Sequence, residues 1–414
     1  MNTHVGFVTD SFLDQDLLFE GGAERVLYRL ALLAKRLGVE VTIYQGGAVT
    51  GNFEYEGINV VRRRVNRHSL GSALASQALV DGCTHLHFQF LELVPGGLPT
   101  NQVTASSHGV FWDFPYATSY RSWYPSRLVT PRSLAIWRRL QKARSLRGLR
   151  RSMAVLSVDS SLLRIVQSDA PELRSKVDVV LNFSDLAPGE PLSTNETDGL
   201  KAIQCARERG RIVILVPRNL SLARGAGWLV EIVESVVQTH AVDCEFFVTG
   251  LPVPVYGRAE QYRRNLEGQL DRALPNVVER LSLLGGVPHK DMATAYELAD
   301  IVLFPTFAYE GCPLGVLEAM TCGRPVVATN IGGFNDVIVD GVTGLLVSPE
   351  VQSIARAISN LARDSARRKA LGTEAQRQAL MRFTLPEWEK RATRFMMRAG
   401  WIDEVGDPQS ITAV

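Results

Sequence analysis

Two glutamates eight residues apart, Glu310 and Glu318, are the first candidates for chemistry in this sequence. They lie in the segment 304–323, FPTFAYEGCPLGVLEAMTCG, which follows an apolar stretch at 301–304 that is typical of a buried strand. Carboxylates accept hydrogen bonds from hydroxyl groups, so this pair suits a ligand that carries sugars. The alternative is a plain strand-loop-helix unit with one surface glutamate and one helix glutamate.

A helix is predicted to begin at about Pro313 or Leu314. Proline suits the first position of a helix because its missing amide would have no intrahelical partner there. The amides of Leu314 and Gly315 would point outward at the positive end of the helix dipole, where an anion binds. An anion site flanked by two carboxylates indicates a phosphate that is joined to sugars.

Two further groups of residues could hold an anion. Gly21 and Gly22 precede a predicted helix, and glycine lets backbone amides approach an anion closely, although two glycines are a weak signal. Arg218 and Arg224 follow a predicted strand at 211–216, where two guanidinium groups could clamp a diphosphate. The simpler alternatives are a turn that starts a helix and a solvated pair of charges.

Three histidines lie on or after predicted strands. His108 ends the strand predicted at 103–107, and parallel sheets bind ligands at the carboxyl ends of their strands, so we favour a site role over a core histidine. His85 and His87 point to the same face of the preceding strand. Because no third ligand is evident, a structural role is favoured over metal binding.

No metal site is predicted. Asp14 and Asp16 form a D-x-D pattern after the first predicted strand, but no second acidic cluster supports it, and we interpret it as a solvated loop. The five cysteines are odd in number and scattered, which is typical of reduced thiols and not of a zinc site or a disulfide framework.

The pattern E-x7-E of Glu310 and Glu318 within EGCPLGVLEAM, followed by CGRPVVAT and a Gly-Gly pair, resembles the family 4 retaining glycosyltransferases. These enzymes have the GT-B fold of two facing Rossmann-like domains, and the resemblance covers most of the chain. It implies that Glu318 holds the nucleotide ribose and that Glu310 lies beside the donor sugar. The chain departs from the family at Cys312 and Pro313, where the family usually has Phe-Gly.

The resemblance implies roles for the other candidates as well. The GG-x-E segment near the N-terminus faces the donor diphosphate in the family, Arg218 matches a family arginine, and Arg224 replaces a lysine. The backbone at Gly286 and Val287 would bind the base, and His108 would lie near the donor sugar and the acceptor. The implied donor-binding residues are Gly21, Gly22, Arg218, Arg224, Gly286, Val287, Glu310, Gly311, Cys312, Pro313, Leu314 and Glu318. The implied catalytic residues are Glu310, His108 and Arg218.

A chain of 414 residues suits two domains rather than one core. The alternation of strands and helices restarts after the polar segment PGEPLSTNETDG, which predicts a linker. We expect an α/β protein of the GT-B class with an acceptor-binding domain at 1–185, a linker at 186–206, a nucleotide-sugar-binding domain at 207–385 and a terminal helix at 386–414 that crosses back to the first domain.

The charge pattern bears on the partners. A net charge of +2 argues against nucleic acid. The segment 121–151 holds ten Lys or Arg residues and no acidic one, so a helix there could lie on anionic lipid or pack its apolar face on the sheet, and packing is favoured. That apolar face would hold Leu134, Trp137, Leu140, Ala143 and Leu146. The aromatic loop at 111–124 leaves acceptor stacking, an interface and simple anchoring open.

The N-terminus has no signal pattern, and no stretch reaches the roughly 18 apolar residues of a membrane span. We expect a cytoplasmic protein, either free or associated with the cytoplasmic face of a membrane. The predicted function is transfer of a sugar from a nucleotide-diphosphate sugar to a hydroxyl of a glycan, glycolipid or natural product, with retention and without a metal or other cofactor. The alternatives are a GT-B phosphorylase or epimerase, and a non-catalytic module that binds sugar nucleotides or docks on membranes.

Overall fold

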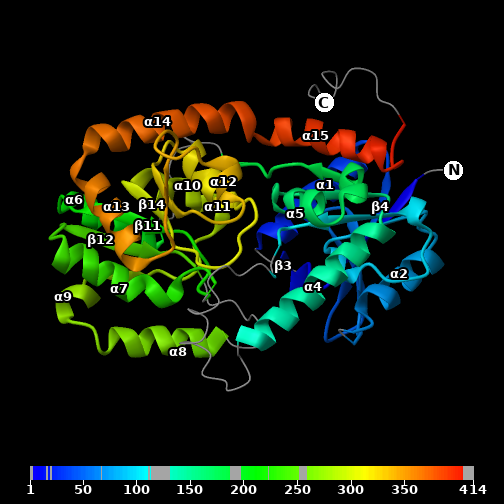
Figure 1. Cartoon of the computed structure of the whole chain (residues 1–414), viewed down its shortest axis with the longest axis horizontal. Helices are drawn as coiled ribbons and strands as arrows, with labels where there is room; N and C mark the ends of the chain where they lie inside the picture. Colours follow the sequence, from blue (N-terminus) through cyan, green and yellow to red (C-terminus); the bar gives the residue numbers. More distant parts are fainter. Residues whose placement is uncertain are drawn as a thin grey trace. The chain divides into compact units, whose positions relative to one another are not determined.

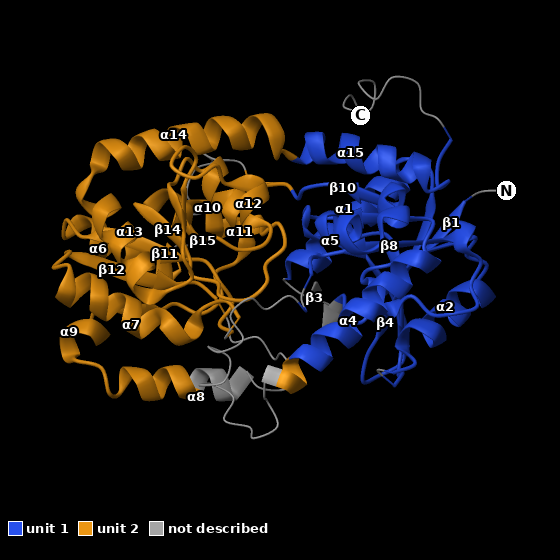
Figure 2. Cartoon of the chain, in the orientation of Figure 1, with its two compact units in different colours: residues 1–112, 135–182, 385–414 blue, residues 113–134, 183–384 orange. Residues whose placement is uncertain are grey.

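The chain forms two compact units in the computed structural model (Figures 1 and 2). Unit 1 contains residues 1–112, 135–182 and 385–414, and unit 2 contains residues 113–134 and 183–384. The structure describes residues 3–14, 17–18, 21–66, 68–110, 112, 131–186, 197–221, 223–250 and 259–403. Each unit has a parallel sheet covered by helices, so the prediction of two Rossmann-like α/β domains is confirmed.

Unit 1 is built on an eight-stranded sheet with the order β10-β9-β8-β7-β1-β4-β6-β5. β5 pairs antiparallel with β6, and the other neighbouring pairs run parallel. All six residues of β1 are buried, because both faces of such a sheet are covered. The strands are β1 (His4–Thr9), β4 (Glu40–Gly46), β5 (Gly51–Tyr55), β6 (Ile58–Arg63), β7 (His85–Phe88), β8 (Val103–Ser107), β9 (Ala154–Ser157) and β10 (Val177–Val179), with a separate short pair β2 (Leu13–Asp14) and β3 (Leu17–Leu18). The helices are α1 (Gly22–Arg36), α2 (Leu70–Val80), most of α4 (Pro131–Arg151), α5 (Ser161–Asp169) and α15 (Leu385–Arg398).

Unit 2 is built on a six-stranded parallel sheet with the order β13-β12-β11-β14-β15-β16. The two central strands β11 and β14 are nearly or wholly buried. The strands are β11 (Ile212–Val216), β12 (Cys244–Val248), β13 (Leu281–Leu283), β14 (Ile301–Phe304), β15 (Val326–Thr329) and β16 (Leu345–Val347). The helices are α6 (Asp198–Glu208), α7 (Leu229–Glu234), α8 (Ala259–Leu270), α9 (Pro275–Val278), α10 (His289–Leu298), α11 (Leu314–Thr321), α12 (Phe334–Val337), α13 (Val351–Arg363) and α14 (Ser365–Arg382).

The terminal helix α15 belongs to unit 1, whereas the residues directly before it, 183–384, belong to unit 2. Trp388 and Phe395 on this helix are buried, as is Trp401 just after it. The ring of Trp401 lies 5.6 Å from that of Phe7 in β1 and 5.3 Å from that of His87 in β7. Aromatic contacts of this kind hold Trp401, just after α15, against the sheet of unit 1.

The boundary between the units differs in detail from the prediction. Helix α6 begins at Asp198, so it overlaps the end of the linker expected at 186–206. Leu200 and Ile203 lie on one face of α6 and are buried within unit 2. The polar residues that precede them hide this helical spacing in the sequence. Asp16 of the D-x-D pattern and residues 113–130 lie outside the described residues.

The basic helix α4 packs differently from the expected apolar face. Leu140 is 59% exposed and Ala143 is also exposed, so the prediction that they pack on the sheet is wrong. Leu146 of the expected face is buried as predicted, together with Ser145 and Leu149, which were not expected on that face. The helix packs on its unit through its last two turns, where Ser145 forms hydrogen bonds with Trp112 and Glu92.

His87 is a buried histidine held by two hydroxyl groups. Its Nδ1 lies 3.0 Å from Thr104 Oγ1 and its Nε2 lies 2.9 Å from Ser106 Oγ. Burial lowers the pKa of His87 to about 3 and that of His108 to about 4. The unfolded chain takes up a proton near pH 6.5, so stability is fully present above that pH and is lost as the pH falls toward these lowered values. The two hydrogen bonds of the buried His87 confirm its predicted structural role.

We therefore expect acid to destabilise the protein by about 2 kcal/mol for each of these two histidines on going from about pH 7.5 to about pH 5. Urea unfolding at the two pH values measures this loss. His87→Gln should flatten the pH dependence, whereas His68→Gln, at an exposed site, should leave it unchanged. Equal pH dependence in His87→Gln and in the parent protein would contradict the assignment.

Candidate active site

Arg218 and Glu310 meet at the carboxyl edge of the sheet in unit 2. Arg218 follows β11 and Glu310 follows the neighbouring strand β14, so the parallel pairing brings the two segments to the same edge. Arg218 Nη2 donates to Glu310 Oε2, and the two side chains are 9% and 13% exposed. The guanidinium also lies 3.5 Å from Thr306 Oγ1 and 5.5 Å from the centre of the Phe304 ring. The structure thus joins two of the predicted catalytic residues in one ion pair.

Gly250 packs against the backbone of Arg218, and no sequence pattern singles it out. It follows β12, the strand on the other side of β11. A Cβ atom at this position would lie 1.8 Å from the carbonyl oxygen of Arg218, so any side chain would displace that carbonyl. The buried Nε of Arg218 has no hydrogen-bond partner among the described residues. A donor group on a fixed backbone with a spare N–H is suited to an anionic ligand.

Glu318 lies on α11 and is buried at the centre of a polar cluster. Tyr296 Oη donates to Glu318 Oε2 at 3.0 Å, and His289 Nε2 lies 3.4 Å from Glu318 Oε1. The same His289 atom lies 3.5 Å from Asp185 Oδ1. His289 and Tyr296 stand seven residues apart on α10, a spacing that puts both on one helix face and that the sequence shows. The cluster thus contacts both oxygens of the Glu318 carboxylate and orients it.

Asp185, His289 and Glu318 also form a set of oxygen and nitrogen atoms that could hold a cation. One ligand atom from each residue lies within 4.8 Å of the others. If the imidazole of His289 carries a proton, it would form ion pairs with both carboxylates. If the imidazole is neutral, a divalent cation could bind to all three residues instead. The sequence-based expectation of a metal-independent protein therefore stays a prediction, and these three residues are where it can fail.

The loop that carries Glu310 ends where the sequence predicts a helix. Pro313 is the cap residue of α11 and Leu314 is its first residue, which confirms the predicted start. The pair Gly332 and Gly333 supports this loop, because the amide of Gly333 donates to the carbonyl of Glu310 at 2.8 Å. At Gly332, where φ is +52°, a Cβ atom would lie 2.2 Å from the same carbonyl oxygen.

The remaining candidates in unit 2 lie in the segments that follow β11, β13 and β14. Arg224 is half-buried after β11, Gly286 is exposed after β13, and Val287 is buried beside it. Gly311 and Cys312 belong to the Glu310 loop, and Cys312 is buried. The structure places all of these residues in the same unit as Arg218, Glu310 and Glu318.

Three candidates belong to unit 1. Gly21 has extended backbone angles and caps α1, whose first residue is Gly22, as the sequence predicts for a helix start. His108 follows β8 and contacts the ring of Phe90, with 5.5 Å between the ring centres. Burial lowers the pKa of His108 to about 4, so its imidazole is neutral at pH 7, and its Nε2 has no partner among the described residues.

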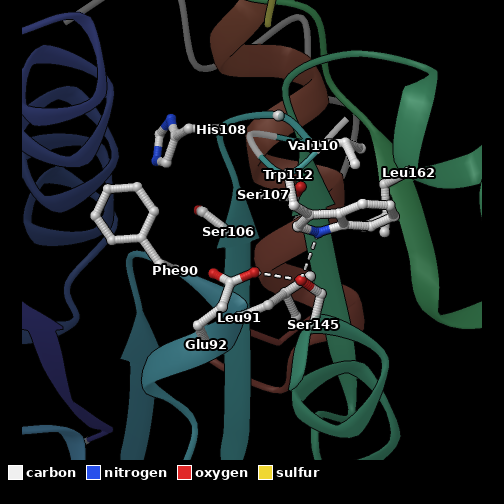
Figure 3. Close-up of a pocket in the computed structure, with 11 residues that line it drawn as sticks. Phe90, Leu91, Glu92, Ser106, Ser107, His108, Val110, Trp112, Ser145 and Leu162 are labelled. Carbon is white, nitrogen blue, oxygen red and sulfur yellow. Dashed lines mark hydrogen bonds between the residues drawn. The ribbon is translucent and has the colours of Figure 1, made fainter. Parts of the chain in front are cut away.

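A hollow next to His108 contains a carboxylate that the sequence did not single out (Figure 3). Glu92 lies in the short helix η1 (Leu91–Leu93) after β7, the strand beside β8. Ser145 Oγ donates to one oxygen of Glu92 and accepts a hydrogen bond of 2.9 Å from Trp112 Nε1. A lone glutamate between two leucines carries no sequence signal of such a role.

Two Rossmann-like α/β units with polar residues at the carboxyl ends of their strands are typical of the GT-B fold. Among solved structures, the fold is similar to sucrose-phosphate synthase from Thermosynechococcus elongatus, with a TM-score of 0.71, 16% identity, and coverage of 95% of this chain and 97% of that one. It is also similar to HepE from Anabaena in complex with UDP-glucose, with a TM-score of 0.69, 17% identity, and coverage of 95% and 99%.

Part of the sequence is similar to a known family. Residues 211–364 match the family model described as "Glycosyl transferases group 1". D-inositol 3-phosphate glycosyltransferase from Paenarthrobacter aurescens is 38% identical over 122 residues, which cover 28% of this chain and 30% of that protein. The aligned part is thus less than a third of that relative. The matched segment contains Arg218, Glu310 and Glu318, so the predicted family resemblance is confirmed there.

Proposed function

We propose that this protein transfers a sugar from a nucleotide-diphosphate sugar to a hydroxyl acceptor, with retention of the anomeric configuration. The observation that carries the proposal is the pairing of Arg218 with Glu310 at the carboxyl edge of the sheet, with the start of α11 beside them. The buried Glu318, aligned by Tyr296, suits the two hydroxyls of a ribose. The glycosyltransferase names of the relatives and the UDP-glucose complex of HepE support this class of donor.

In the proposed reaction the bond between the sugar and the diphosphate breaks, and a bond from the same anomeric carbon to the acceptor oxygen forms. The acceptor proton goes to the departing phosphate on the same face, so no protein base is assigned. Arg218 offsets the charge that builds on the departing phosphate. When the diphosphate takes this guanidinium, the carboxylate of Glu310 is released to accept hydrogen bonds from the donor sugar.

Thermal unfolding with a panel of nucleotide sugars tests the donor, with UDP-glucose first because HepE binds it. The stabilising compound is then incubated with sugar and polyol acceptors, and the anomeric configuration of the product is read by NMR. A retained product supports the proposal. Turnover that requires inorganic phosphate would indicate a phosphorylase, turnover without an acceptor would indicate an epimerase, and binding without turnover would indicate a non-catalytic module.

Treatment with EDTA is expected to leave the turnover unchanged, because Arg218 and the amides at the start of α11 supply the charge compensation that a metal would give. The measurement compares turnover before and after chelation, and after addition of Mg²⁺ or Mn²⁺. Activity that is lost with EDTA and restored by a divalent cation would contradict this prediction. Loss of that restoration in Asp185→Asn would then point to the cluster with His289 and Glu318.

We further propose that α4 contacts anionic lipid. Ile136 and Leu140 are each 59% exposed, and with Ala143 they lie on one helix face. Exposed arginines flank this face, and the helix contains no acidic residue; these arginines are Arg132, Arg139, Arg144, Arg147 and Arg150. Charge and exposed apolar area together favour the surface of an anionic bilayer. Among the described residues, the helices are too short or too polar to cross a membrane.

Vesicles that contain phosphatidylglycerol are expected to carry the protein down in co-sedimentation, and vesicles of phosphatidylcholine alone are not. Leu140→Asp should weaken this binding by about tenfold, because it removes an apolar contact and introduces a negative charge that the anionic lipid repels. Val80→Asp is the matched control, since Val80 is 82% exposed on α2 of the same unit. Equal binding of Leu140→Asp and the parent protein would overturn the proposal.

A further inference from the structure

The hollow in unit 1 is formed by segments that meet at the carboxyl ends of β7 and β8 (Figure 3). It spans about 410 Å³ when the solvent at its mouth is included, and the centre of a water molecule can reach about 60 Å³ of it. The lining residues are Phe90, Leu91, Glu92, Ser106, Ser107, His108, Gly109, Val110, Trp112, Ser145 and Leu162. Its size admits the edge of a ring with its hydroxyl groups, while the rest of a ligand stays in the mouth.

Glu92 presents one carboxyl oxygen to this hollow and anchors the other. The anchored oxygen accepts from Ser145 Oγ, which itself accepts from Trp112 Nε1 at 2.9 Å. The second oxygen faces the space between Ser106 and Phe90 (Figure 3). A carboxyl group that is held by one oxygen and turns the other toward the hollow can accept a hydrogen bond from a ligand hydroxyl there.

The other walls of the hollow favour a particular chemistry. Phe90 and the buried Trp112 supply aromatic surface, which suits the apolar face of a sugar or cyclitol ring. His108 lies at the same end of the sheet, with its buried Nε2 lacking a partner among the described residues. Among the described residues, the lining contains no lysine or arginine that would contact a phosphate directly, and ionised Glu92 would repel one.

We propose that Glu92 is an acceptor-binding residue and that it takes a hydroxyl of an uncharged polyol ring, either a sugar or a cyclitol. Ser145 and Trp112 position its carboxyl group through their chain of hydrogen bonds. This inference rests on the proposed glycosyl transfer for its biological meaning. The binding of the polyol itself does not depend on that reaction and can be measured without a donor.

Saturation-transfer NMR with glucose and with myo-inositol, on the full chain without donor, tests the proposal. The parent protein should bind at least one of these compounds. Glu92→Leu, which keeps the volume but removes both oxygens, should weaken that binding by about tenfold or more. Glu92→Gln, which keeps an acceptor and the contact with Ser145, should have a smaller effect and provides the comparison if Glu92→Leu does not fold. Glu172→Gln, at an exposed glutamate of the same unit, is the matched control.

A parallel measurement separates this inference from the proposed function. Stabilisation by UDP-glucose, or by the nucleotide sugar found to bind, should be the same in the Glu92 variants and in the parent protein. If no nucleotide sugar binds but a polyol binds through Glu92, the proposed function fails and the polyol site stands. Unchanged polyol binding in folded Glu92→Leu, no binding of either polyol to the parent protein, or binding only of a phosphorylated inositol would each overturn the inference.

Discussion

Replacing Arg218 with alanine is expected to lower kcat/KM by about 10²–10⁴-fold while the fold survives. The guanidinium is 9% exposed, paired with Glu310 and held on a backbone that Gly250 fixes, so it is oriented before the donor arrives. Its removal takes away the charge that offsets the leaving diphosphate and leaves the Glu310 carboxylate without this partner. The kcat/KM of Arg218→Lys should lie between those of Arg218→Ala and the parent protein, because lysine keeps the charge but lacks the planar guanidinium group.

Steady-state kinetics with the identified donor measure this effect, and circular dichroism with thermal unfolding checks the fold. Arg209→Ala is the matched control, because Arg209 forms an ion pair with Glu245 in the same unit and is 53% exposed. Glu310→Ala should also lower turnover by orders of magnitude, and the double variant should lose less than the sum of the two, since the residues act on one ligand. Turnover of folded Arg218→Ala within about twofold of the parent would refute the assignment.

Replacing Gly332 with alanine is expected to weaken binding of the nucleotide sugar by about tenfold or more and to cost about 2–4 kcal/mol of stability. The residue has φ +52°, and a Cβ atom would lie 2.2 Å from the carbonyl oxygen of Glu310. The Glu310 loop would have to move away, and the ion pair with Arg218 would move with it. Binding is measured by calorimetry and stability by urea unfolding.

Gly210→Ala separates the two causes of that loss. Gly210 has φ +75° in the same unit, but nothing lies within 4 Å of the place of its Cβ atom. Gly210→Ala should lower the free energy of unfolding by only about 1–2 kcal/mol, through backbone strain, and leave the affinity for the nucleotide sugar unchanged. If Gly332→Ala binds the nucleotide sugar as tightly as Gly210→Ala does, the glycine does not support the loop in the way the structure indicates.

The sequence by itself determined the features that depend on neighbouring residues. The apolar stretches and their alternation with helices predicted two parallel α/β domains, because buried strands and amphipathic helices follow short repeating patterns. Proline at position 313 predicted the start of α11 to within a residue, since its missing amide is tolerated there. The spacing of Glu310 and Glu318 also identified the segment that the family model later matched.

Only the tertiary structure decided which of these residues meet. Arg218 and Glu310 are 92 positions apart, and Glu92 and Ser145 are 53 apart, so neither pair leaves a pattern in the local sequence. The order of strands in each sheet brings them together, and glycines without a Cβ atom allow the close backbone contacts at Gly250 and Gly332. The buried part of α4 also depends on residues distant in sequence: Ser145 forms hydrogen bonds with Trp112 and Glu92, and Leu146 and Leu149 are buried beside it, whereas Leu140 of the expected face is exposed.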